Sequence, residues 1–144
     1  MLEFSVLIQA APDVEGQWLA HCLNWDVVSQ GDSPKHALEM IVEAIIIAIE
    51  DDRAAGLDPA DRPSAKRESW DRFLSVQQGG TRIAAADIES LPESRGTSIA
   101  AVLYLSTIDI RAVQRPPSIV RGHPNAPPPF VIAELNHDSR SARG

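Results

Sequence analysis

The sequence predicts an α+β fold: a small antiparallel sheet with one long packed helix, a later added strand and an irregular, Pro-rich C-terminal tail. Three observations carry this prediction. Three strand-like segments follow one another within residues 2–30, joined by short connections that favour an antiparallel meander. A long apolar segment then begins behind a helix-capping sequence at Ser33. A further alternating segment occurs at residues 99–110.

The amino-acid composition is typical of a globular domain and excludes several kinds of binding site. The 144 residues are 44% hydrophobic and 23% charged, which suffices for one hydrophobic core. The formal net charge of -7 argues against tight DNA binding, because phosphate neutralisation needs clustered Lys and Arg. The single cysteine, Cys22, excludes an intramolecular disulfide and a multi-cysteine zinc site.

The expected location is the cytoplasm, without membrane association. A lone cysteine suits a reducing compartment. The first residues, Met1-Leu2-Glu3-Phe4, lack the basic and apolar regions of a signal peptide. The apolar run at residues 44–49 is six residues long, far below the roughly 20 that a membrane helix needs.

The pattern of residues 2–30 predicts the three strands of the meander. Residues 2–9 alternate at period two, which predicts a strand buried on one face only. A turn with Pro, Asp and Gly occupies residues 11–16. Residues 17–23 and 26–30 are the second and third predicted strands.

The predicted helix spans Ser33 to about Ala55. Ser33 suits the N-cap, Pro34 the first helical position, and Gly56 the C-terminal stop. Its apolar positions extend well past one face, so one small sheet cannot cover it. Either the C-terminal half of the chain or another subunit must pack there. We predict an oligomer interface that contains three of these positions: Met40, Ala44 and Ile47.

The remaining segments are predicted from local signals. Residues 57–63 form a linker, residues 64–78 a second helix capped by Ser64, and residues 81–91 a short third helix capped by Thr81. Residues 99–110 are apolar on both faces, which predicts a strand buried on both sides. In the Pro-rich tail, we expect residues 130–135 as an isolated extended segment and residues 136–144 frayed.

A short motif adds a family resemblance. Ser29-Gln30-Gly31-Asp32-Ser33 leads into a helix with Ala37-Leu38 and Glu43-Ala44, after an earlier Gly16-Gln17-Trp18-Leu19-Ala20 strand. Over residues 4–55, this order resembles the N-terminal domain of HicB-like antitoxins. The resemblance implies a partial ribonuclease-H-like fold in which residues 99–110 are the later strand. The predicted domains are therefore a HicB-like domain at 1–112, with an insertion at about 57–97, and a tail at 113–144.

The resemblance also implies a function. Members of this family typically bind and block a small ribonuclease toxin, and many repress their own operon through a C-terminal DNA-binding domain. This sequence lacks a convincing recognition helix after residue 56. We therefore expect protein binding without tight DNA binding. Trp25 and Gln30 are the candidate partner contacts, although core packing also explains Trp25.

No catalytic, cofactor or metal site emerges from the residues. Metal-assisted phosphodiester cleavage needs converging carboxylates, whereas Asp13, Asp26 and Asp32 fall in turns or at element ends. Glu39 and Glu43 lie one helical turn apart, where a solvated face is the simpler explanation. His21 and Cys22 are adjacent on a predicted strand and so point to opposite faces.

Three functional interpretations remain. The first is a non-enzymatic HicB-like protein that neutralises a small basic ribonuclease toxin, because the acidic chain complements a basic partner. The second is a solitary HicB-like homo-oligomeric scaffold without a toxin. The third is a small metal-dependent hydrolase.

Overall fold

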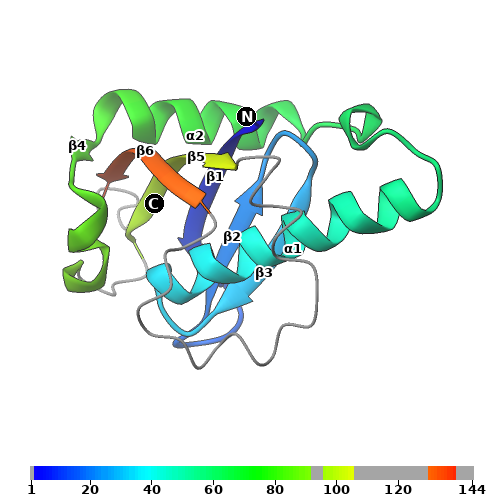
Figure 1. Cartoon of the computed structure of the whole chain (residues 1–144). Helices are drawn as coiled ribbons and strands as arrows, with labels where there is room; N and C mark the ends of the chain where they lie inside the picture. Colours follow the sequence, from blue (N-terminus) through cyan, green and yellow to red (C-terminus); the bar gives the residue numbers. More distant parts are fainter. Residues whose placement is uncertain (1, 92–95, 106–129, 139–144) are drawn as a thin grey trace.

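The computed structural model describes residues 2–91, 96–105 and 130–138, and its central element is a six-stranded antiparallel sheet (Figure 1). The strand order is β3-β2-β1-β5-β6-β4. The fold is α+β, as the sequence predicts, with a long helix and strands added after it. The strands are β1 (Leu2–Ala10), β2 (Trp18–Cys22), β3 (Val27–Gly31), β4 (Thr81–Arg82), β5 (Ser98–Leu105) and β6 (Phe130–Asp138).

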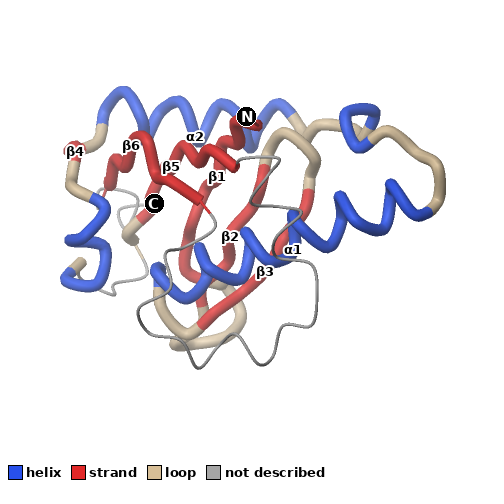
Figure 2. The backbone as a smooth tube through the Cα atoms, viewed as in Figure 1, coloured by secondary structure: helices blue, strands red, loops and turns tan. Residues whose placement is uncertain are grey.

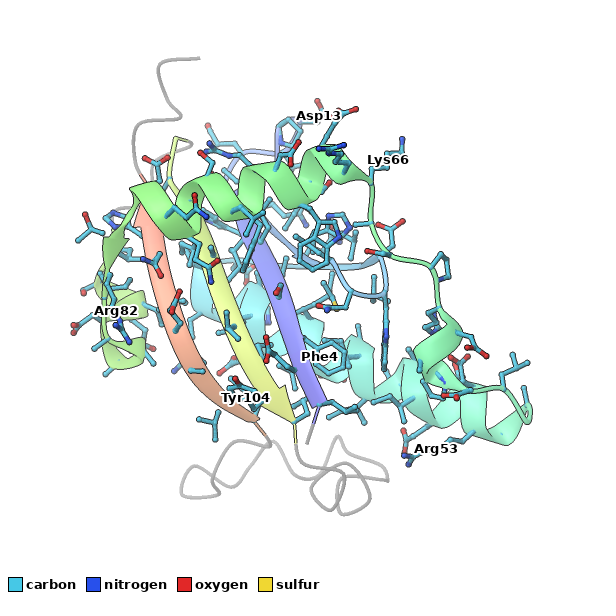
Figure 3. All side chains as sticks on the ribbon, turned by 90° about the horizontal axis from the view of Figure 1, so that it is seen from above. Phe4, Asp13, Arg53, Lys66, Arg82 and Tyr104 are labelled. Carbon is cyan, nitrogen blue, oxygen red and sulfur yellow. The ribbon has the colours of Figure 1, made fainter. Side chains whose placement is uncertain are left out.

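Helices cover both faces of this sheet. The long helix α1 (Pro34–Ala54) packs on β3, β2 and β1, and α2 (Arg67–Gly79) crosses β5, β6 and β1 on the opposite face. Figure 2 shows both helices in blue against the red strands, and Figure 3 shows α2 in front of the sheet with α1 behind it. Two short 3-10 helices, η1 (Pro59–Asp61) and η2 (Ala85–Ser90), complete the described elements. None of the helices in the described part of the chain is long and apolar enough to cross a membrane.

The meander and α1 form where local signals predict them. Ser33 is the N-cap of α1, and its Oγ accepts a hydrogen bond of 3.1 Å from the His36 backbone N–H. Pro34 begins the helix, where its missing N–H had no partner. Gly56 follows the helix with φ +76, a left-handed conformation that glycine adopts without steric cost.

Gly31 allows α1 to approach β3 closely. A Cβ atom at this position would lie 2.5 Å from the Ala37 backbone nitrogen and 2.7 Å from the His36 carbonyl carbon. Both neighbours are backbone atoms at the start of the helix, so they cannot swing aside as a flexible side chain would. The glycine of the Ser29–Ser33 motif therefore has a steric role.

Gly31→Ala should lower the free energy of unfolding by about 1–3 kcal/mol, because the added methyl group must push α1 away from the sheet. Urea unfolding followed by circular dichroism measures this loss. Gln30→Ala, at the adjacent exposed position, is the control and should change stability by less than about 0.5 kcal/mol. Equal stability of the two variants would contradict the close approach.

The prediction that residues 2–9 are buried on one face only is wrong. Phe4, Val6 and Ile8 face α1, but Leu7 on the other face is also buried. Helix α2 covers this second face, where it forms its own apolar cluster. The cluster contains Leu7, Leu23, Ala65, Phe73, Val76 and Ala100. The described part of the 99–110 prediction, β5, is buried on both sides over its first four residues, as expected, whereas Val102 and Tyr104 on the α2 side are half-buried. Residues 106–110 lie outside the described residues.

Helix α2 begins later than predicted, and Ser64 is not its cap. The N-cap is Lys66, without a side-chain hydrogen bond. Ser64 Oγ instead accepts a bond from Trp70 Nε1 at 2.8 Å and donates to the Leu23 carbonyl at 3.1 Å. The hydroxyl thus ties the segment before α2 to the end of β2.

The predicted third helix at 81–91 forms only over Ala85–Ser90, as the 3-10 helix η2, and Thr81 is not its cap. Thr81 and Arg82 form β4, which pairs with His137 and Asn136 of β6, and η2 follows. The Ile83 N–H then donates to the Leu135 carbonyl at 2.9 Å. Pairing with a distant strand overrides the local helical signal.

The largest correction concerns residues 130–138. They form β6, which lies between β5 and β4, so the segment is neither isolated at 130–135 nor frayed at 136–138. Phe130, Ile132 and Leu135 pack in the α1-side core, while Glu134, Asn136 and Asp138 face α2. There Gln77 Nε2 donates to Glu134 Oε1 at 2.9 Å. These residues belong to the same sheet as β1, although the sequence places them in the tail; the prolines at 116–129 lie outside the described residues.

Candidate protein-binding surface

Strand β3 forms one outer edge of the sheet. Its five residues, Val-Val-Ser-Gln-Gly, carry no charge, and Asp26 and Asp32 bound them. Val28 is 54% exposed and Gln30 is exposed. The structure thus places Gln30, a predicted partner contact, on an accessible edge.

The hydrogen-bond pattern shows which way the backbone of β3 points. Leu23 N–H donates to the Ser5 carbonyl at 2.9 Å, so the odd-numbered residues of β2 bond toward β1. The even-numbered residues of β2 consequently bond toward β3, where they pair with Val27, Ser29 and Gly31. Val28 and Gln30 therefore direct their backbone N–H and C=O groups away from the sheet.

Trp25, the other predicted contact, lies against the core. Its ring meets Phe4 edge-on, with centroids 4.8 Å apart and planes at 81°. The side chain is half-buried and packs against the α1-side cluster. Asp26 follows with φ 54 in the β2–β3 turn, a conformation that Asp tolerates, and its Oδ1 lies 2.6 Å from His21 Nε2.

The predicted interface stripe of α1 starts above β3. Ala37 lies over Gly31, and Met40, Ala44 and Ile47 follow it at helical spacing. Ile47 is 49% exposed, whereas Met40 and Ala44 are half-buried and Ala44 contacts the core. Lys35 points to the other side of the helix, where its Nζ bonds Glu89 of η2 at 2.9 Å. The stripe and the β3 edge thus adjoin.

The polypeptide that builds this surface is strongly acidic. Residues 2–58 contain eleven Asp and Glu residues against two basic residues, Lys35 and Arg53. Glu89 engages Lys35, and this hydrogen bond raises the pKa of the ammonium group. At one end of β3, the Asp32 side chain is 97% exposed. Asp26 and Asp32 place negative charge at both ends of β3, which favours the approach of a positively charged partner.

Two ion-pair or hydrogen-bond contacts elsewhere in the described chain shift a pKa. Arg62 holds Asp52 through two bonds of 2.7 and 3.0 Å, and this contact raises the pKa of the guanidinium group. Tyr104 Oη donates to Glu3 Oε1 at 3.3 Å, and the charge of that carboxylate raises the tyrosine pKa (Figure 3 labels Tyr104).

Within residues 2–91, 96–105 and 130–138, no three His, Cys, Asp or Glu side chains lie close enough together to hold a metal ion. Glu39 and Glu43 are exposed on α1. His21 and Cys22 point to opposite faces of β2, as predicted, and Cys22 lies in the α1-side core.

Burial raises the pKa of the Cys22 thiol from 9.0 to about 11. Because the unfolded chain loses this proton first, stability should fall as pH rises from about 9 to 11, by about 2–3 kcal/mol. Urea titrations at pH 8, 9.5 and 11 measure the decline. Cys22→Ala, which lacks the thiol, should show a shallower pH dependence; identical slopes would contradict the assignment.

A polar network beneath α2 is absent from the sequence predictions. Arg72 Nη2 donates to Ser98 Oγ at 2.9 Å, and its Nη1 lies 3.9 Å from Asp138 Oδ2. Gln9 Nε2 reaches the same hydroxyl at 3.5 Å. The signal in the sequence was the polar residue at every second position from 134 to 138. These contacts link β6, the last described strand, to α2 and β1.

Comparison of the chain with protein-family models, with curated proteins and with solved structures gave no match. The HicB-like resemblance thus remains a prediction from residues 4–55.

Proposed function

We propose that this chain is a HicB-like, non-enzymatic protein that acts by binding other proteins, and that its partner is a small basic ribonuclease toxin. The charge of residues 2–58, eleven acidic residues against two basic ones, carries the proposal. Such a surface accelerates encounter with a basic protein and disfavours association with nucleic acid. The Ser33 cap and the close packing at Gly31 give the Ser29–Ser33 motif a structural basis consistent with the resemblance. The proposal places the protein in the cytoplasm, where the toxin would act.

Recovery of the tagged full-length chain from its native host tests this function. We expect a short basic protein in stoichiometric amount, with ribonuclease activity that the purified chain suppresses. Because the attraction is electrostatic, the association rate should fall as salt rises from 50 to 500 mM. Failure to recover any basic protein would contradict the proposal.

Two further assays test whether the chain hydrolyses RNA or binds DNA tightly. RNA hydrolysis by the chain itself, dependent on magnesium or manganese and lost in Glu39→Gln and Glu43→Gln, would establish the hydrolase alternative. A salt-sensitive, nanomolar complex with a fragment of its own promoter would contradict the expected lack of tight DNA binding.

Self-association is the second candidate function, and the exposure of Ile47 favours it. Ile47 is 49% exposed and lies on the same stripe of α1 as the half-buried Met40 and Ala44, and a contiguous apolar patch of this kind is typical of a contact surface. In this alternative, copies of the chain associate through Met40, Ala44 and Ile47 and form a homo-oligomeric scaffold.

Ile47→Glu and Met40→Glu should each weaken self-association by at least about tenfold, because a charge would be buried in the contact. Light scattering at micromolar concentration measures the change. Leu57→Glu is the matched control, since Leu57 is 61% exposed beyond the end of α1. A monomeric unmodified chain under these conditions would contradict the alternative.

A further inference from the structure

We infer that β3 is a docking strand, to which an extended, basic segment of a partner protein adds as a seventh strand of the sheet. The inference rests on the proposed function and deepens it, because it names the part of the molecule that makes the contact. It predicts recognition through main-chain hydrogen bonds along Val28 and Gln30, flanked by salt bridges at Asp26 and Asp32.

The two edges of the sheet differ. β4 is two residues long and includes Arg82, which Figure 3 shows at that side of the sheet. Short length and positive charge are features that protect an edge from pairing with other strands. β3 is longer and uncharged, and its pairing with β2 shows no register shift in the described residues. Of the two edges, β3 is therefore the one open to a further strand.

The outward backbone groups of β3 can form a ladder. Val28 and Gln30 each offer one N–H and one C=O to the outside. Across the described part of the chain, no hydrogen bond outside the sheet engages the backbone of either residue. The Asp32 N–H, just beyond, is occupied by His36 Nδ1 at 2.9 Å, which limits the free ladder to β3 itself.

Charge selects a basic occupant over a second copy of the chain. If two β3 strands paired antiparallel about Ser29, Asp26 of one copy would oppose Asp32 of the partner subunit at both ends. Parallel pairing in register would bring the equivalent aspartates together. A partner strand with Lys or Arg at its ends would instead attract Asp26 and Asp32, whichever way it paired. The excess of acidic residues in 2–58 adds to the same preference through its long-range attraction for positive charge.

The side chains next to the edge fit such a strand. Val28 is 54% exposed on the α2 face, where an apolar or β-branched side chain of the partner can pack beside it. On the other face, the stripe of α1 that begins above Gly31 offers Met40 as a second apolar contact. The partner strand should therefore alternate apolar residues between basic ends.

The test uses the full-length chain and a synthetic probe. The probe is an N-acetylated, C-amidated heptapeptide with alternating valine and threonine between terminal lysines. Hydrogen exchange and NMR titration follow the amides of Val28, Ser29 and Gln30. In the free chain we expect fast exchange at Val28 and Gln30 and slow exchange at Ser29, and the probe should slow the two fast amides at least about fivefold.

Matched probes and variants separate the contributions. N-methylation of the probe on alternate backbone nitrogens, or glutamate in place of its lysines, should weaken binding at least about tenfold. Gln30→Pro removes an outward N–H without breaking the β2–β3 ladder and should weaken binding to the same extent. Gln30→Thr, which keeps the N–H, should retain binding.

Several outcomes would overturn the inference. Slow exchange at Val28 and Gln30 in the free chain at every concentration would mean that the chain covers its own edge. Protection that appears only at high protein concentration would assign the edge to a second copy. If the natural basic partner binds Gln30→Pro as tightly as the unmodified chain, the docking strand is wrong but the proposed function stands. If no basic protein binds at all, the proposed function itself fails.

Discussion

A chain that ends at residue 129 should lose cooperative folding, because it lacks β6. This strand pairs with β5 over eight positions and supplies the only partner of β4 in the described sheet. Without it, buried β5 becomes a bare edge, and Leu135 no longer covers the core. Arg72 also loses Asp138. We expect a broad, non-cooperative urea transition and strong binding of an apolar dye.

A chain that ends at Asp138 is the matched control, since it keeps all of β6. It should unfold in a single sharp transition with at most a small loss of stability. A sharp transition in the chain that ends at 129 would show that β1–β5 and the two helices fold without β6. In that case β6 would add to a sheet that is already folded without it.

Phe4→Ala should lower the free energy of unfolding by about 3–5 kcal/mol. Phe4 is 1% exposed on β1, in the α1-side core, and its ring contacts Trp25 edge-on. Removal of the ring loses apolar burial and leaves a cavity that the surrounding strands and helix cannot fill. Urea unfolding followed by far-ultraviolet circular dichroism measures the change without relying on Trp25 fluorescence.

Val131→Ala provides the control for this measurement, since Val131 lies on β6 with 64% of its side chain exposed. Its effect should be below about 1 kcal/mol, because it buries little apolar surface in the folded state. Similar losses in the two variants would contradict the central position of Phe4.

Local signals in the sequence were sufficient to predict the first half of the fold. Period-two alternation locates β1 and β2, and the Ser33 cap, Pro34 and Gly56 delimit α1. Each of these signals acts within a few residues, so a single sequence contains the information.

The second half depends on pairing between distant residues. Thr81 and Arg82 adopt an extended conformation because β6 lies beside them, although their local sequence also suits a helix. Asn136 and Asp138 looked too polar for a sheet, yet both are buried beneath α2, where Arg72 approaches Asp138. Only the fold brings such groups together, and for this reason the sequence did not reveal them.

In the candidate surface, too, local signals predicted some features, and long-range strand pairing determined others. The motif singled out Gln30, and the structure places it on an open edge. Which strand is outermost depends on where β5 and β6 pair, so the edge itself was not predictable from residues 26–33. Helical spacing puts Met40, Ala44 and Ile47 on one stripe of α1, but it could not show that Ala44 touches the core.

The order of the strands has a consequence for the chain as it leaves the ribosome. β1 can pair with β2 as soon as both strands have emerged, but its other neighbour, β5, starts only at Ser98. At about 5–20 residues per second, β1 waits for several seconds with the edge that faces β5 unpaired. Through this interval the part of the chain already synthesised includes its most acidic segment, residues 2–58. Repulsion between these negative charges keeps neighbouring nascent chains apart until β5 closes the sheet.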